Sequence, residues 1–192
     1  MIMVRYNGVM TREETSMNGV FAGLDPAIRE HLEVIREGSG LPADERSLEL
    51  LAEGWREKES AFDRQAASMG MEDSDRSPDP ERGFLALTMS GSLVAVGPDE
   101  NGRRRAVYVS IDRRRDVPAR AESDDAVLGG EVAKGSEISF ETGPVRKSSA
   151  VYRLAVLPEK LAIEHQNEKL DEATVALTRE FQAVDETRID ED

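Results

Sequence analysis

The spacing of apolar positions changes twice along the chain. Up to about residue 70, apolar residues recur every three or four positions, as in amphipathic helices. Between residues 83 and 157 they form short runs separated by glycine-rich or polar turns, which is typical of strands. After residue 158 the helical spacing returns. The pattern therefore predicts helices, then an antiparallel sheet, then a further helix.

Two helices are predicted in the N-terminal third. Asp25 is a good N-cap and Pro26 suits the first helical position, so a helix is expected from there to the glycines at 38–40. A longer helix is expected over residues 44–69. Its apolar seam consists of Leu48, Ala52, Trp55, Phe62, Ala66 and Met69. At this spacing Trp55 is interpreted as a core residue rather than a ligand contact.

The first 20 residues allow two interpretations. Asn7-Gly8 is compatible with a two-residue hairpin turn. Thr11 and Glu14 are equally compatible with a helix capping box. Residues 71–82 are polar and acidic and contain two prolines, so they are predicted to form a linker.

The central region is predicted to contain five strands. They are expected at residues 84–89, 93–96, 104–111, around 138–140 and 150–157. Residues 98–102 form a strong turn signal between the second and third strands. Residues 112–136 are polar and irregular, with a short helix or an edge strand expected near residues 126–128.

The C-terminal segment is predicted to be an amphipathic helix that ends in an acidic tail at residues 185–192. Its seam consists of Leu170, Ala173, Leu177, Phe181 and Val184. This seam packs either on the 44–69 helix or the barrel, or on a partner's surface. The fold class expected is α+β, a small antiparallel OB-like β-barrel flanked by N-terminal helices and a C-terminal amphipathic helix. The expected organisation is a helical region at 1–70, a linker at 71–82, a barrel at 83–157, and a helix and tail at 158–192.

Charge is distributed unevenly over these regions. The 192 residues carry a net charge of −14, with −8 in residues 1–82, +1 in 83–157 and −7 in 158–192. The flanks should repel polyanions, so only the centre could attract one. The chain has no cysteine, which excludes disulfides and thiolate chemistry. No secretory signal is seen, and the longest uncharged stretch is too short to span a bilayer, so a soluble, cytoplasmic protein is expected.

The inventory for catalysis is thin, and neither a catalytic site, a metal site nor a cofactor is predicted. His165 lies near Glu164 and Glu168, but no second His or Cys pair supports a metal site. The stretch GGEVAKGS at 129–136 has its lysine before the glycine, so it is rejected as a phosphate loop. His31 also lies next to a glutamate in a predicted helix. We find no case for an enzyme.

The central strands resemble an OB-fold barrel of the cold-shock type. The stretches that carry the resemblance are LVAVGPDENG, VYVS at 107–110 and KGSEISFETGPVRKSSA at 134–150. This family implies single-strand nucleic-acid binding on aromatic side chains with basic edges. The residues that this would assign here are Arg103, Arg104, Arg105, Tyr108, Arg113, Arg114, Arg115, Arg146 and Lys147. The neighbouring strand, SGSLVAV, lacks the family's two further aromatics, which leaves Tyr108 alone on the expected platform.

Two functions from different classes lead, and an enzyme that uses carboxylates alone is a third class. The arginine triplets at 103–105 and 113–115 either bind an anion or neutralise the chain's own carboxylates, and the second interpretation is favoured because both flanks are acidic. The leading hypothesis is therefore a non-enzymatic interaction or regulatory protein. It would contact a protein partner or copies of itself through its amphipathic helices and an arginine-rich barrel rim. The alternative is single-stranded nucleic-acid binding modulated by the acidic tail; no membrane partner is expected.

Overall fold

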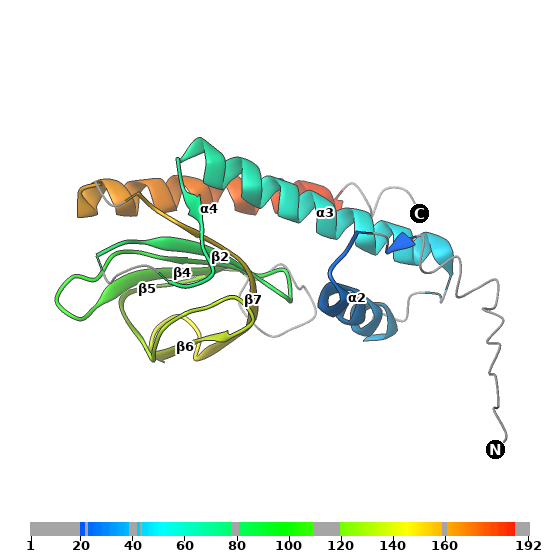
Figure 1. Cartoon of the computed structure of the whole chain (residues 1–192), viewed down its shortest axis with the longest axis horizontal. Helices are drawn as coiled ribbons and strands as arrows, with labels where there is room; N and C mark the ends of the chain where they lie inside the picture. The colour runs from blue at the N-terminus through cyan, green and yellow to red at the C-terminus, as the bar shows by residue number, and fades with distance from the viewer. Residues whose placement is uncertain are drawn as a thin grey trace, which may run out of the picture. The chain divides into compact units, whose positions relative to one another are not determined.

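The computed structural model of the chain describes residues 20–21, 23–38, 42, 44–77, 81–109, 120–158 and 161–186. The predicted α+β architecture is confirmed, because a small closed antiparallel barrel is flanked by helices (Figure 1). The chain divides into two compact units, residues 1–54 and 55–192, and the boundary falls inside a long helix. Residues 1–19, where a hairpin turn or a capping box was expected, lie outside the described residues.

Three helices begin close to where the sequence predicts them. They are α2 (Pro26–Gly38), α3 (Glu45–Ser68) and α4 (Ile163–Glu186). Asp25 caps α2 by accepting a hydrogen bond from the Ala27 amide at 2.8 Å. Asp44 caps α3 in the same way, accepting from the Ser47 amide at 2.8 Å. In both cases a side-chain oxygen satisfies an amide that the helix itself leaves without a partner.

Among the described residues, seven strands form the sheet. They are β1 (Glu72–Asp73), β2 (Phe84–Thr88), β3 (Leu93–Val96), β4 (Arg104–Val109), β5 (Arg120–Leu128), β6 (Glu137–Thr142) and β7 (Lys147–Val156). From β2 to β7 each strand pairs antiparallel with the next, and β7 pairs with β2 to close the barrel. β1 pairs with the end of β7, so part of the stretch expected to be a linker joins the sheet.

The barrel has six strands, one more than the sequence predicted. The additional strand is β5, which covers residues expected to be mostly irregular. Ala126 is the one fully buried side chain of β5, so this strand lacks an apolar run that a sequence pattern could reveal. The barrel is OB-like in its size and closure, but its strands follow simple up-and-down order, whereas an OB-fold is a five-stranded Greek-key barrel.

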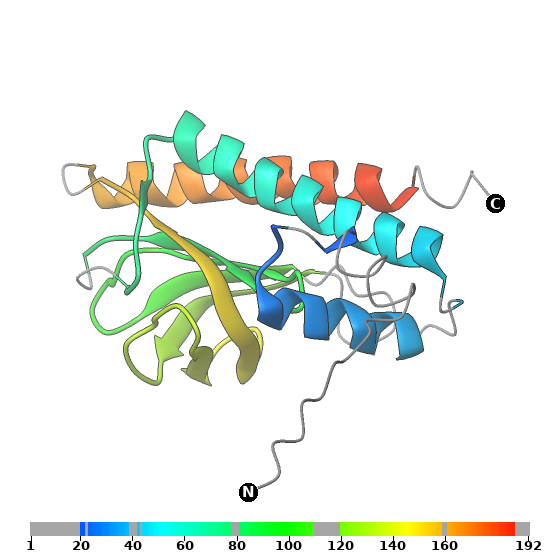
Figure 2. The ribbon, with the colours of Figure 1, turned by 45° about the vertical axis from the view of Figure 1, so that its right-hand side comes forward.

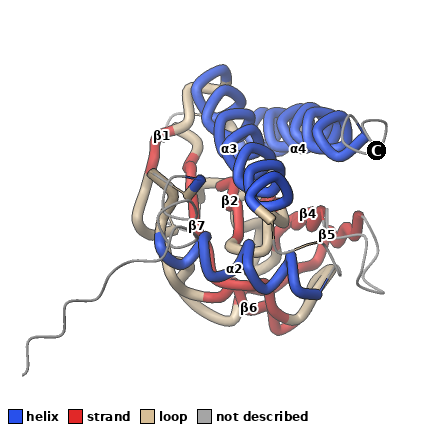
Figure 3. Tube along the Cα trace, turned by 90° about the vertical axis from the view of Figure 1, so that its right-hand side faces the viewer, coloured by secondary structure: helices blue, strands red, loops and turns tan. Residues whose placement is uncertain are grey.

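Two apolar cores lie on opposite faces of the same strands. One fills the barrel and includes Phe84, Val94, Ile138 and Leu154. The other lies between the outside of the barrel and the helices, and it combines side chains of β2, β3, β4 and β7 with Phe62 of α3 and residues of α4. Figures 1 to 3 show the second half of α3 and α4 on the same side of the barrel. This double coverage explains why β2 and β3 are uninterrupted apolar runs rather than alternating ones.

Gln166 attaches the first turn of α4 to the start of β2. Its Oε1 accepts a hydrogen bond from the Gly83 amide at 2.8 Å, and its Nε2 donates to the carbonyls of Glu81 and Leu161, both at 3.0 Å. The side chain is buried and its amide is satisfied on both sides. A Cβ on Gly83 would come within 2.7 Å of Leu170 Cδ1, so the absence of a side chain lets α4 approach the strand.

Candidate interaction surface

The three arginines of the first triplet, 103–105, lie in three different environments. Backbone alternation along β4 places Arg105 on the face covered by α4, with Val107, while Arg104 shares the inward face with Tyr108. Arg103 precedes the strand in a tight turn and is exposed. The turn is formed by Asn101 and Gly102, both with positive φ, and its residues were correctly predicted as a turn.

Arg104 is a buried cation at one end of the barrel, where only 8% of the residue is exposed. Its Nη1 donates to the Gly97 carbonyl at 3.3 Å, and its Nε lies 4.0 Å from Asp99 Oδ2. Burial lowers the pKa of the Arg104 guanidinium, and the Asp99 carboxylate only partly opposes that shift. This guanidinium is therefore held by its own turn and is not presented to an anionic ligand.

Arg105 is surrounded by carboxylates from two elements. It pairs with Asp171 of α4, and its guanidinium nitrogens lie 3.5 Å from Asp124 Oδ1 and 3.8 Å from Glu122 Oε2, both on β5. The guanidinium thus joins β5 to α4 across the surface of β4. This geometry is that of internal counter-charge.

Tyr108 lies inside the barrel rather than on an outer platform. It is 8% exposed and packs in the interior core, and its hydroxyl donates to Ser92 Oγ at 3.0 Å. Ser92 in turn lies 3.3 Å from Ser90 Oγ, which accepts from Ser149 Oγ at 2.8 Å. The sequence identified the strand and its alternation, but the face it assigned to the outside is the interior. The ring therefore has no open side on which a base could stack.

The hydroxyl groups near the β2–β3 turn form hydrogen bonds with one another. Thr88 joins them, because its Oγ1 lies 3.1 Å from Ser90 Oγ and accepts from the Ser92 amide at 3.2 Å. A serine nucleophile needs an adjacent general base, and the hydrogen bonds found here are to other hydroxyls and to backbone groups. The cluster joins the β2–β3 turn to β7.

Of the remaining predicted residues, the structure describes two, both near the turn between β6 and β7. Arg146 is exposed in the turn between β6 and β7. Lys147 is exposed too, and its Nζ pairs with Glu137 at 3.1 Å. Arg113, Arg114 and Arg115 lie outside the described residues.

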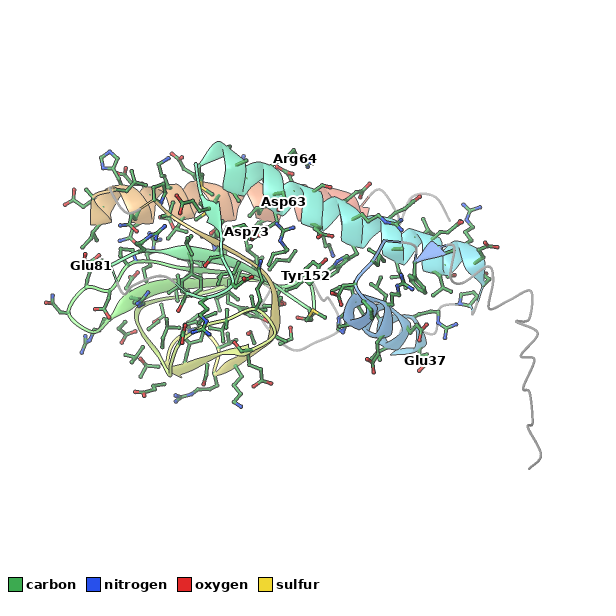
Figure 4. The ribbon with its side chains drawn as sticks, in the orientation of Figure 1. Glu37, Asp63, Arg64, Asp73, Glu81 and Tyr152 are labelled. Carbon is green, nitrogen blue, oxygen red and sulfur yellow. The ribbon has the colours of Figure 1, made fainter. Side chains whose placement is uncertain are left out.

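A second ion-pair cluster, in which three carboxylates surround Arg153 of β7, was missed by sequence reasoning. Arg153 lies 2.7 Å from Asp63 Oδ1 and 3.4 Å from Glu59 Oε1 on α3, and 3.7 Å from Asp73 Oδ1 on β1. Burial lowers the pKa of Arg153, but Asp63, Asp73 and Glu59 together outweigh burial, so its pKa lies above the ordinary value. Figure 4 shows Asp63, Asp73 and neighbouring Tyr152 where α3, β1 and β7 meet. No sequence signal connects these residues, because the contacts span about 90 positions.

The part of the 44–69 seam that lies in the second unit, and the described part of the α4 seam, pack in the outer core of that unit. Ala61, Phe62, Ala66 and Met69 of the α3 region, and Leu170, Ala173 and Leu177 of α4, are all buried in the outer core. Of the two packing alternatives left open by the sequence, the described residues show packing on the barrel. The side chains of Phe181 and Val184 lie outside the described part. The described members of these two seams are therefore occupied within the chain.

β5 is paired along only one edge for most of its length. Residues 120–126 pair with β4, whereas on the other side the register with β6 covers Val127 and Leu128. Arg120, Glu122, Asp124 and Asp125 are all exposed. Among the described strands, none pairs with the second edge of residues 120–125. The barrel thus closes through a short ladder and leaves an acidic strand edge beside it.

The described residues contain no group of three or more histidine, aspartate and glutamate side chains placed to hold a metal ion. His165 is exposed on α4, and His31 is half-buried on α2. Within the described ranges, no helix has the length and apolarity needed to cross a membrane.

Comparisons with protein-family models, with curated proteins and with solved structures found no match for this chain. Its function must therefore be inferred from the chemistry of its own surface.

Proposed function

We propose that the protein is a non-enzymatic interaction protein that binds a protein partner through the acidic surface of its barrel. The observation that supports this proposal is the environment of Arg105. A cation that could have attracted an anionic ligand is surrounded by Glu122, Asp124 and Asp171 of the same chain. The carboxylates around it outnumber it, so the surface at this place is complementary to a basic partner.

We assign partner binding to the barrel surface rather than to the amphipathic helices. This choice is supported by the described apolar side chains of α4 and of the second half of α3, which pack in the outer core of the second unit. Partners that meet a polar, charged surface associate with rates and affinities that depend on salt. The binding is therefore expected to weaken as ionic strength rises.

The experiment compares two ligand classes on the full chain. The protein is immobilised and partners are recovered from an extract of its source cells at low and at high salt, with reciprocal capture by each recovered protein. Arg103→Glu, an exposed position beside the surface, serves as a control for the general effect of charge. A reciprocally confirmed protein partner that is released by salt supports the proposal.

The competing class is tested with the same preparation and a labelled single-stranded oligonucleotide at low salt. Tyr108→Phe keeps the buried ring and removes only its hydroxyl. We expect neither the wild type nor this variant to bind the oligonucleotide. Salt-dependent oligonucleotide binding without a reciprocal protein partner would contradict the proposed function.

A further inference from the structure

We propose that the open edge of β5 is a docking site for an extended, basic segment of a partner protein, which adds to the sheet as a further strand. This inference rests on the proposed function and names the site and the chemistry of the partner. The open edge consists of residues 120–124, with the sequence RAESD, because the Asp125 carbonyl already accepts a hydrogen bond from Thr142 Oγ1 of β6 at 2.8 Å. Strand addition satisfies the backbone groups of an unpaired edge, and side chains then provide specificity.

Along an antiparallel strand, successive residues direct their backbone N–H and C=O groups to alternate sides. This alternation identifies which residues of β5 direct these groups away from β4. The Gly97 amide donates to the Arg105 carbonyl at 2.7 Å, so Arg105 directs its backbone towards β3. Backbone direction alternates along an antiparallel strand, so Ala106 and Tyr108 direct theirs towards β5. In the register of the two strands they oppose Ser123 and Ala121. The backbone N–H and C=O of the intervening Glu122 therefore point away from β4.

The side chains along this edge favour a basic occupant. Glu122, Asp124 and Asp125 oppose a single cation on the edge, Arg120, and the carboxylate of Asp124 is 92% exposed. Arg120 itself is engaged, because its Nε donates to Glu122 Oε1 at 2.5 Å. Arg105 and Arg120 pair with Glu122 and Asp124, but the four carboxylates of Glu122, Asp124, Asp125 and Asp171 outnumber these two cations. A lysine- or arginine-rich strand would therefore meet a net negative charge here.

Charge also excludes a second copy as the favoured occupant. Each edge carries an excess of carboxylates, and an antiparallel pair centred on Glu122 would place the two Glu122 carboxylates opposite one another, which destabilises a ladder. An extended basic segment meets the same backbone groups with attraction instead of repulsion. The proposal therefore commits to a different protein with a basic, strand-forming segment.

The test uses the full chain and a labelled ten-residue peptide that alternates valine with lysine. Fluorescence anisotropy at low salt measures binding to the wild type and to two variants. Glu122→Pro removes the outward N–H, and proline is tolerated on strand edges where that group faces solvent. Glu122→Gln removes the charge and keeps the N–H. We expect Glu122→Pro to weaken binding tenfold or more and Glu122→Gln to weaken it only a few fold.

A second measurement does not depend on whether Glu122→Pro folds. Amide exchange followed by NMR on the wild type should show the Glu122 amide becoming protected when the peptide is added, while the amides of Ala121 and Ser123 are already protected without it. A peptide with glutamate in place of lysine should give no protection.

Four results would overturn the inference: no binding of the basic peptide, equal binding by a folded Glu122→Pro variant, equal binding of the glutamate peptide, or concentration-dependent dimerisation that Glu122→Pro abolishes. These results are distinguishable from failure of the proposed function. If a reciprocally confirmed partner still binds the folded Glu122→Pro variant, the interaction function stands and the edge is not its site.

Discussion

Two regions of the same barrel are built in opposite ways. One region is the wall formed by β2 and β3, and the other is the first half of β5, residues 120–125. Phe84 to Thr88 are fully buried, because the barrel interior lies on one side and the helices lie on the other. Residues 120–125 of β5 include no fully buried side chain. Apolar burial therefore holds the wall, whereas hydrogen bonds to one neighbour and ion pairs hold the β5 half.

This difference separates stability from binding within one small sheet. A strand that is covered on both faces and paired on both edges has no group left for a partner. A strand with exposed faces and a free edge adds little to the core but keeps backbone and charged groups available. Four predictions test this comparison, in order of decreasing effect.

Phe84→Ala should cause the largest loss. It removes a fully buried ring from the barrel interior, which costs about 3–5 kcal/mol in the free energy of unfolding. Val127→Ala, at the end of β5 that also pairs with β6, truncates a smaller, half-buried side chain and should cost less than half as much. Urea unfolding followed by fluorescence of Trp55, the single tryptophan, measures both. Similar losses at the two positions would remove the distinction between wall and β5.

Gln166→Leu should destabilise the wall because buried backbone groups lose their hydrogen bonds, not because a cavity forms. The Gly83 amide and the Glu81 and Leu161 carbonyls would lose their partner, and an orphaned buried group costs about 1–3 kcal/mol. Gln65→Leu is the matched control, since Gln65 makes one side-chain hydrogen bond, to Glu180 near the surface. The same unfolding measurement applies. A loss no greater than the control's would show that Gln166 does not anchor α4.

Arg105→Gln tests whether ion pairing holds the β5 half. The guanidinium is one-third exposed, so its pairs with three carboxylates should contribute only about 0.5–1 kcal/mol at low salt and less as salt is added. The neighbouring Arg103→Gln, at an exposed position, should change stability little. Thermal unfolding at two ionic strengths measures the difference. Equal effects of the two substitutions would favour a general charge effect over specific counter-charge.

Asp44→Asn should give the smallest effect, and only in acid. The Ser47 backbone amide holds the pKa of Asp44 below its ordinary value of 3.8, so its ionised form stabilises the start of α3. That stabilisation is present above the unfolded pKa and is lost as pH falls through the lowered folded pKa. Asparagine also caps helices but does not titrate, so the variant should lack this component. Helical circular dichroism from pH 5 to pH 2 compares the two proteins. Identical acid profiles would contradict the assignment.

Much of the fold could be predicted because its signals are local. The cap at Asp25, the start of the second long helix near Asp44, the turn at Asn101-Gly102 and the apolar runs of β2 and β3 each depend on neighbouring residues. β5 could not be predicted in the same way. Its polar residues are compatible with a loop, and they form a strand because β4 offers an edge to pair with.

The sequence predicted less of the candidate surface than of the fold. The alternation of β4 was correct, but alternation does not state which face is inside, and Tyr108 could be placed only when the barrel closed around it. The favoured interpretation of residues 103–105 as internal counter-charge agrees with the pairs of Arg104 and Arg105. The identities of their partners came from β5, α4 and the adjoining turn.

The sequence by itself determined the order of helices and strands, their caps and turns, and the excess of negative charge, since each depends on residues close together in the chain. Only the tertiary structure decided which face of β4 became the interior, which carboxylates neutralised Arg105 and Arg153, and which strand edge remained open. These properties depend on segments that are distant in sequence and meet only when the barrel closes.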